Sequence, residues 1–202
     1  MTAQINTSDR IRKITFLGIM SALVIVLQLL GNFIKLGTFS ISLVLVPIVL
    51  GAVIAGAYGG AWLGTVFGIT VLIAGDAALF LGINPVGTVV TVIAKGLLAG
   101  LAAAIVYKAV APKKPYLAVF LAAVTCPVVN TGVFILGCYA FFFDAISAWA
   151  VTEGVSAAVY IFLGLAGINF VTEFIINIVL CPVIMRLISV VKNSYGKRRK
   201  LS

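Results

Sequence analysis

The chain has 202 residues, of which 63% are hydrophobic and 9% are charged, and its mean hydropathy is +1.26. A soluble domain could not bury so much apolar surface, so the composition excludes a soluble enzyme and predicts an all-α integral membrane protein. Since a membrane helix takes about 20 apolar residues, the length gives room for about six spans in one transmembrane domain, residues 1–202. The chain has no histidine, which removes His-based metal sites and catalytic triads, and we expect no enzymatic activity, metal or cofactor.

The predicted spans follow the apolar runs of the chain. The first run comes after a polar amino-terminal stretch and is too long for a signal-peptide core, so we expect it to be retained as a span. The second and third runs flank a glycine-rich turn at 56–60 and are shorter than the bilayer is thick, so we expect them to be tilted or packed within the protein. The six spans cover residues 14–34, 43–55, 61–74, 86–107, 116–143 and 157–191.

Lysine and arginine gather on one side of this topology. Basic residues that flank spans are retained on the cytoplasmic side, which predicts that both termini are cytoplasmic. Of the 14 basic residues, only Lys35 then faces outward, Lys95 lies within the fourth span, and the rest fall inside. Three of the 5 acidic residues, Asp76, Asp144 and Glu153, fall outside. We therefore expect a multi-pass plasma-membrane protein whose charge of +9 reflects topology and anionic lipid headgroups of the bilayer, not nucleic acid.

Small residues recur at four-residue spacing on three predicted spans. In lipid such residues let helix backbones approach closely. We expect internal packing for the third and fourth spans, whereas on the first span a partner helix from another protein is an equal alternative. The residues are Gly60, Gly64 and Gly68 on the third span, Gly96, Gly100 and Ala104 on the fourth, and Gly18 and Ala22 on the first.

Polar side chains lie at membrane depth on three predicted spans, where an ionisable group is costly unless it pairs or meets water. Helical spacing places Thr88, Thr91 and Lys95 on one face of the fourth span. It also groups Asn169, Glu173 and Asn177 on the sixth, while Asn130 and Thr131 lie near the middle of the fifth. This pattern predicts a buried polar cavity, and a direct pair between Lys95 and Glu173 is the structural alternative, which can coexist with it. The candidate substrate-binding residues are Asn84, Lys95, Asn130, Glu173 and Asn177.

Aromatic residues are predicted toward the outer half of the membrane or in its loops. Most fit an interfacial belt. The links 35–42 and 75–85 are placed to close over an outward-opening cavity, with Phe39 or Trp149 stacking on a ligand. The six residues are Phe39, Trp62, Phe80, Tyr139, Trp149 and Tyr160.

Size, topology and several short segments together resemble the substrate-binding S components of energy-coupling factor (ECF) vitamin transporters, small six-span proteins with both termini in the cytoplasm. The resemblance covers nearly the whole chain. Residues 18–22 (GIMSA) are similar to the family's AxxxA-type groove for the shared transmembrane subunit. The other similar segments are the Phe39-Ser40 link, the glycine-rich turn near 56–60, and residues 129–131 (VNT) and 169–173 (NFVTE).

The resemblance implies that the protein binds a vitamin or related micronutrient from outside and is energised by partners. These partners would be an ECF transmembrane subunit, docking on Gly18 and Ala22, and two ATPase subunits. The chain has no GxxxxGK[ST] phosphate loop, which fits ATP hydrolysis by a partner. The implied location is the bacterial plasma membrane.

The polar residues favour pantothenate as the substrate, with riboflavin and folate next. A lysine at cavity depth suits a carboxylate, and amides suit hydroxyl and amide groups. For riboflavin, the resemblance leads us to expect an acidic residue after Ser40 and a basic residue at position 173, which is Glu.

Two alternatives from other classes stay open. A stand-alone secondary transporter would use Glu173 to take up and release a coupling proton against Lys95, although the two halves of the chain show no convincing repeat. A membrane scaffold would use the polar stripe for packing alone.

Overall fold

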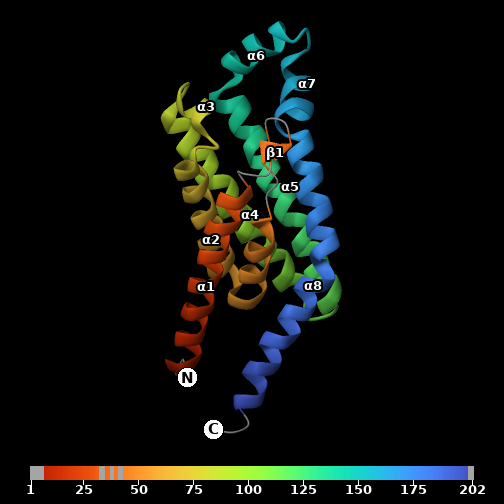
Figure 1. Cartoon of the computed structure of the whole chain (residues 1–202). Coiled ribbons are helices and arrows are strands. Elements are labelled where there is room, and N and C mark those ends of the chain that lie inside the picture. The colour runs from red at the N-terminus through yellow and green to blue at the C-terminus, as the bar shows by residue number, and fades with distance from the viewer. Residues whose placement is uncertain (1–6, 32–34, 37–38, 41–42, 200–202) are drawn as a thin grey trace.

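The computed structural model describes residues 7–31, 35–36, 39–40 and 43–199 and consists of long helices with shorter elements at one end (Figure 1). The long helices are α1 (Thr7–Gly31), α2 (Leu45–Ala74), α4 (Pro85–Val110), α5 (Pro115–Phe141) and α8 (Gly167–Arg199). The shorter helices are α3 (Ala78–Leu81), α6 (Phe143–Thr152), α7 (Ala157–Val159) and the π-helical turn η1 (Tyr160–Leu165). Two-residue strands β1 (Lys35–Leu36) and β2 (Phe39–Ser40) pair antiparallel, with Lys35 opposite Ser40.

The described residues form 5 helices that are long and apolar enough to cross a bilayer, one fewer than predicted. The difference lies in α2, which contains both the second and the third predicted span. The chain passes from one to the other at Gly56, whose φ of 74° is left-handed and suits a residue without a Cβ atom. No linking loop separates the two halves, which is why they form one element.

The two halves of α2 fold back on each other at Gly56 (Figure 1). A Cβ atom built on Gly59 would lie 2.6 Å from the carbonyl oxygen of Gly51, and one built on Gly60 would lie 3.1 Å from Ala52 Cβ. Residues eight apart in a continuous helix are separated by about 12 Å along its axis, so these contacts require a hairpin. The first half, residues 45–55, is about 16 Å long and too short to cross a hydrocarbon core of about 30 Å alone.

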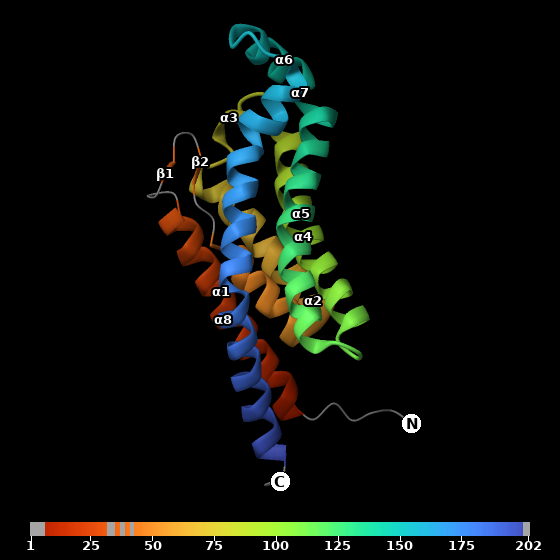
Figure 2. The ribbon, with the colours of Figure 1, turned by 90° about the vertical axis from the view of Figure 1, so that its right-hand side faces the viewer.

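The start of α1 and the end of α8 lie at the same end of the molecule, while α3, α6 and α7 lie at the other (Figures 1 and 2). The hairpin in α2 explains this arrangement. The chain reverses direction between successive long helices and once more within α2, and this additional reversal brings the end of α8 to the same end as the start of α1. Which end faces the cytoplasm stays a prediction. The predicted end of the first span at Ile34, part of the link 35–42 and Lys200 of the basic tail lie outside the described residues.

The glycine ladders pack α2 against α4, as predicted. Gly60 faces Gly100 and Gly64 faces Gly96, so closely that a Cβ atom on any of the four would overlap the carbonyl oxygen opposite. This contact lets the two backbones touch, which supplies dispersion energy where the surrounding lipid offers no hydrophobic driving force.

We expect Gly64→Ala to lower the free energy of unfolding by about 1–3 kcal/mol, because the added methyl group forces the α2 and α4 backbones apart. Gly132→Ala on α5 is the matched control, since a Cβ atom there meets nothing within 4 Å. Alanine is the better helix former by about 1 kcal/mol, so the control should leave stability unchanged or raise it. The apparent melting temperature in detergent measures both, and equal melting temperatures would contradict the packing.

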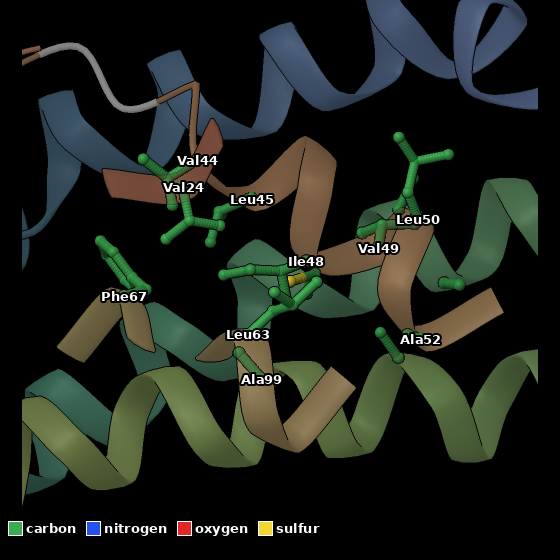
Figure 3. Packing of buried hydrophobic residues seen from close by; sticks show 14 of the residues in the cluster. Val24, Val44, Leu45, Ile48, Val49, Leu50, Ala52, Leu63, Phe67 and Ala99 are labelled. Carbon is green, nitrogen blue, oxygen red and sulfur yellow. The ribbon is translucent and has the colours of Figure 1, made fainter. Parts of the chain in front are cut away.

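The main hydrophobic core lies between α1, α2, α4, α5 and α8 (Figure 3). Figure 3 shows Val24 of α1, Ile48 and Leu63 from the two halves of α2, and Ala99 of α4 gathered in this core. All four have an exposed fraction of 0%. Because both halves of α2 contribute to it, the core holds the hairpin inside the bundle.

Candidate functional site

Glu173 of α8 is buried between helices and connects α8 to α5. Its Oε2 atom accepts a hydrogen bond from Asn130 Nδ2 at 3.2 Å, and its Oε1 atom accepts one from Asn169 Nδ2 at 3.2 Å. One helical turn further on, Asn177 Nδ2 donates to the backbone carbonyl of Glu173 at 2.9 Å. The polar stripe predicted on the last span therefore meets the polar residue predicted in the middle of the fifth.

Lys95 lies near the middle of α4, between two aromatic rings. Its Nζ atom is 5.5 Å from the ring centre of Phe67 on α2 and 5.6 Å from that of Phe134 on α5, at distances where a cation is attracted to a ring face. The carboxylates of Glu173 and Asp76 interact with the ammonium group electrostatically. Over the described residues, however, no carboxylate lies within the 4.0 Å of an ion pair with Lys95.

The direct pair between Lys95 and Glu173, the alternative to a cavity, is thus absent from the described part of the chain. Glu173 is held by amides and Lys95 by rings. A lysine ammonium has three N–H donors, and rings do not replace the acceptors that these donors seek. A ligand carboxylate would therefore find the donors of Lys95 free.

Three buried oxygen atoms near this pair of charges have no hydrogen-bond partner among the residues that the structure describes. They are Thr91 Oγ1, Asn130 Oδ1 and Asn177 Oδ1. A buried polar atom without a partner costs about 1–3 kcal/mol, so such atoms mark places for a ligand or an ordered water. Within the described residues, no group of three His, Cys, Asp or Glu side chains is placed to hold a metal ion.

Four of the five predicted substrate-binding residues, Lys95, Asn130, Glu173 and Asn177, thus belong to one polar cluster at the middle of the bundle. Asn84 is separate, because it precedes α4 as the N-cap residue and its side chain accepts a hydrogen bond from Gly87 N at 2.9 Å. Lys95 follows 11 residues later, about 16 Å away along the helix axis.

We expect Asn84→Ala to lower stability by about 1 kcal/mol through loss of the helix cap, and Asn84→Ser, which keeps a capping oxygen, to preserve it. If capping is the only role of Asn84, the serine variant also keeps the wild-type ligand affinity. A calorimetric titration of both variants measures this, and a loss of affinity in the serine variant would instead place Asn84 at the ligand.

The two aromatic residues beside Lys95 were not predicted. Phe67 and Phe134 lie on different helices from Lys95, and no spacing within one helix signals a contact that only the packing of α2, α4 and α5 creates. Asn169 lies in the predicted stripe but was not included among the candidate site residues. A further contact that was missed joins Gln28 of α1 to Asp76 after α2, with Nε2 donating to Oδ2 at 2.6 Å.

The end of the molecule opposite the termini carries an aromatic cluster, which reaches the site through Phe134. Phe80 packs edge-on against Phe134 with ring centres 5.9 Å apart and lies 6.3 Å from Trp149. Trp149 in turn lies 6.5 Å from Tyr160. Tyr139 stacks on Phe143 at the same end, so these predicted aromatic residues lie at one end of the molecule, and its outward orientation stays a prediction.

Trp62 does not lie with the other predicted aromatic residues. Trp62 follows the turn at Gly56 by six residues, so it lies in the half of the molecule that holds the termini. There its Nε1 atom donates to Ser21 Oγ at 3.1 Å, and its ring stacks on Tyr58. The side chain of Phe39 lies outside the described residues.

Gly18 and Ala22 lie on an exposed face of α1. A Cβ atom built on Gly18 would meet nothing within 4 Å, and Ala22 is exposed as well. Among the described residues no helix fills this face, unlike the ladders on α2 and α4. Of the two alternatives for these small residues, this exposure favours a helix from another protein.

A family model described as ECF transporter, substrate-specific component, matches residues 12–185 of the chain. No curated protein and no solved structure matches the chain.

Proposed function

This chain belongs to the family of substrate-specific components of ECF transporters, and from that premise we propose that it binds a micronutrient with a carboxylate group, pantothenate first. The family places the chain among membrane subunits for the uptake of vitamins or other micronutrients, not among enzymes. The choice of ligand within this class comes from the polar cluster.

The observation that supports a carboxylate ligand is the ammonium group of Lys95, which has no carboxylate within 4.0 Å among the described residues. Lys95 is half-buried, and a charge that is withdrawn from water without a counter-charge is costly, so a ligand carboxylate there would form a favourable charge-assisted hydrogen bond. Pantothenate has one carboxylate, two hydroxyl groups and an amide N–H. Its hydroxyl and amide donors suit the unpartnered oxygens of Thr91 and Asn177.

Riboflavin and folate fit this arrangement less well. Riboflavin has no carboxylate and would leave Lys95 without a counter-charge. Folate has two carboxylates. In the described interior Lys95 can pair with one of them, and the other would lack a cation while the carboxylate of Glu173 lies nearby. Charge matching therefore ranks pantothenate ahead of both.

The test is to identify the ligand of the purified chain. We expect mass spectrometry of the small molecules released on denaturation to find a carboxylate-bearing vitamin. We also expect calorimetry to show that pantothenate binds with a stoichiometry near one, and more tightly than riboflavin or folate. Tight binding of riboflavin with no binding of pantothenate would contradict the choice of ligand.

We further propose that transport needs partners, namely an ECF transmembrane subunit and two ATPase subunits, in a plasma membrane with both termini of this chain in the cytoplasm. The exposed small-residue face at Gly18 and Ala22 supports such a docking site on α1. A stand-alone proton-coupled transporter is the competing function, and it predicts transport by this chain alone.

A further inference from the structure

Among the side chains that the structure describes, Lys95 and Glu173 are the charged ones that lie inside the helix bundle. The other charged side chains that the structure describes lie at helix ends, in turns or on the outer surface, such as Asp76 after α2, Asp144 in α6 and the exposed Arg186 on α8. With Lys95 as an ammonium and Glu173 as a carboxylate, the described interior carries one positive and one negative group that form no ion pair, and it is neutral overall. Any ligand that carries a net charge disturbs this balance.

A carboxylate bound at Lys95 would remove part of what stabilises the negative charge of Glu173. Burial opposes the negative charge of Glu173, while the charge of Lys95 and two amides support it. A ligand carboxylate would neutralise Lys95 and add a like charge near the buried Glu173, where an excess charge costs several kcal/mol. The balance is restored if Glu173 takes up a proton.

The surroundings of Glu173 already contain an acceptor for that proton. Asn130 donates its Nδ2 hydrogen to the Glu173 carboxylate, while its Oδ1 atom is buried and has no partner among the described residues. A protonated carboxyl gains an O–H donor and can pair with an amide in both directions, O–H to Oδ1 and N–H to the acid oxygen. Protonation would thus give a partner to an oxygen that has none among the described residues.

Other titratable groups near Glu173 cannot take the proton. Lys95 on α4 and Cys126 on α5 interact with it electrostatically, but an ammonium and a thiol already carry their protons. Tyr160 of η1 packs against Trp149, and the titratable side chain of α2 in the described part is Tyr58, which is 71% exposed.

We propose that the protein binds its carboxylate ligand together with one proton from solvent, which converts the carboxylate of Glu173 to the acid. No electrons move, and the only bond formed is the O–H bond of Glu173. This inference rests on the proposed carboxylate ligand. Because the bound state holds one more proton than the free state, affinity rises as pH falls, by up to about tenfold per pH unit.

The test is calorimetry of pantothenate binding to the purified chain in buffers of different ionisation enthalpy. We expect the observed enthalpy to vary with buffer enthalpy with a slope near one proton taken up per ligand. The alcohol analogue of pantothenate, which lacks the carboxylate, should give a slope near zero on the same protein. This second ligand keeps the test independent of any variant that fails to fold.

Glu173→Gln should bind pantothenate without proton uptake and without the pH dependence, whereas the exposed Glu153→Gln should behave like the wild type. A slope of zero for pantothenate on the wild type, with binding that still depends on Lys95, would overturn this inference and leave the proposed function intact. Proton uptake that persists in Glu173→Gln would overturn the assignment to Glu173. Absence of pantothenate binding would overturn the choice of ligand and this inference with it.

Discussion

Replacing Lys95 with methionine is expected to weaken pantothenate binding by about 10- to 100-fold. A hydrogen bond to a charged group contributes about 1.5–3 kcal/mol, and each 1.4 kcal/mol corresponds to about a tenfold change in affinity. Methionine keeps much of the length and apolar character of the lysine stem, so the contacts with Phe67 and Phe134 lose mainly their charge. A calorimetric titration measures the change.

The alcohol analogue separates a loss of charge pairing from a loss of shape. We expect it to bind the wild type weakly and Lys95→Met with nearly the same affinity, because it has no carboxylate to pair with the ammonium group. Lys108→Met removes an exposed basic residue from the last turn of α4 and should leave both ligands unaffected. Equal weakening of both ligands by Lys95→Met would contradict a charge pair.

Replacing Ala22 with leucine is expected to block transport while sparing ligand binding. A bulky side chain on the open face of α1 would keep a partner helix from approaching Gly18, and overpacking of a close helix contact costs about 1–3 kcal/mol. Transport in the assembled complex should therefore fall by about 10- to 100-fold. Uptake of labelled ligand into cells or proteoliposomes, with calorimetry on the same variant, measures the two properties separately.

Ala140→Leu on α5 is the matched control for this experiment. Ala140 is also an exposed alanine on a long helix, but it lies near the end of the molecule opposite the termini. Its replacement adds the same bulk to the lipid-facing surface and should leave transport unchanged. If both leucine variants transport normally, the face at Gly18 and Ala22 is not a docking surface.

Much of the helical framework could be predicted because its signals are local. Small residues four apart fall on one helix face, so Gly60, Gly64, Gly96 and Gly100 could be assigned to a helix contact before their partners were known. The stripe around Glu173 follows from the same periodicity. These patterns need nothing from the rest of the fold.

The hairpin in α2 and the surroundings of Lys95 depend on tertiary packing. Gly56 could be recognised as a turn, but the sequence does not reveal that the two halves would touch so closely that they form one element. The same reversal places Trp62 beside Ser21, away from the aromatic cluster. Likewise, the sequence predicts that Lys95 and Glu173 lie in one cluster. Only the packing shows that Glu173 contacts amides and Lys95 contacts aromatic rings, and that the two do not form an ion pair.

The capping role of Asn84 shows a different limit. An asparagine before a proline that begins a helix is a strong N-cap signal, and the same polar amide also suits a ligand. The sequence could not choose between these roles because the distance from Asn84 to Lys95 depends on where α4 begins. The structure supplies that distance and leaves the other four candidates as the cluster to test.

Uptake of labelled pantothenate into proteoliposomes tests most directly the claim that this chain binds substrate and relies on partners for transport. We predict that vesicles containing the chain alone bind pantothenate but accumulate none, even with an imposed proton gradient. Vesicles that also contain an ECF transmembrane subunit and its two ATPase subunits should accumulate it when ATP is supplied on the side of the ATPases. Accumulation by the chain alone, driven by the proton gradient, would contradict the account and identify a secondary transporter.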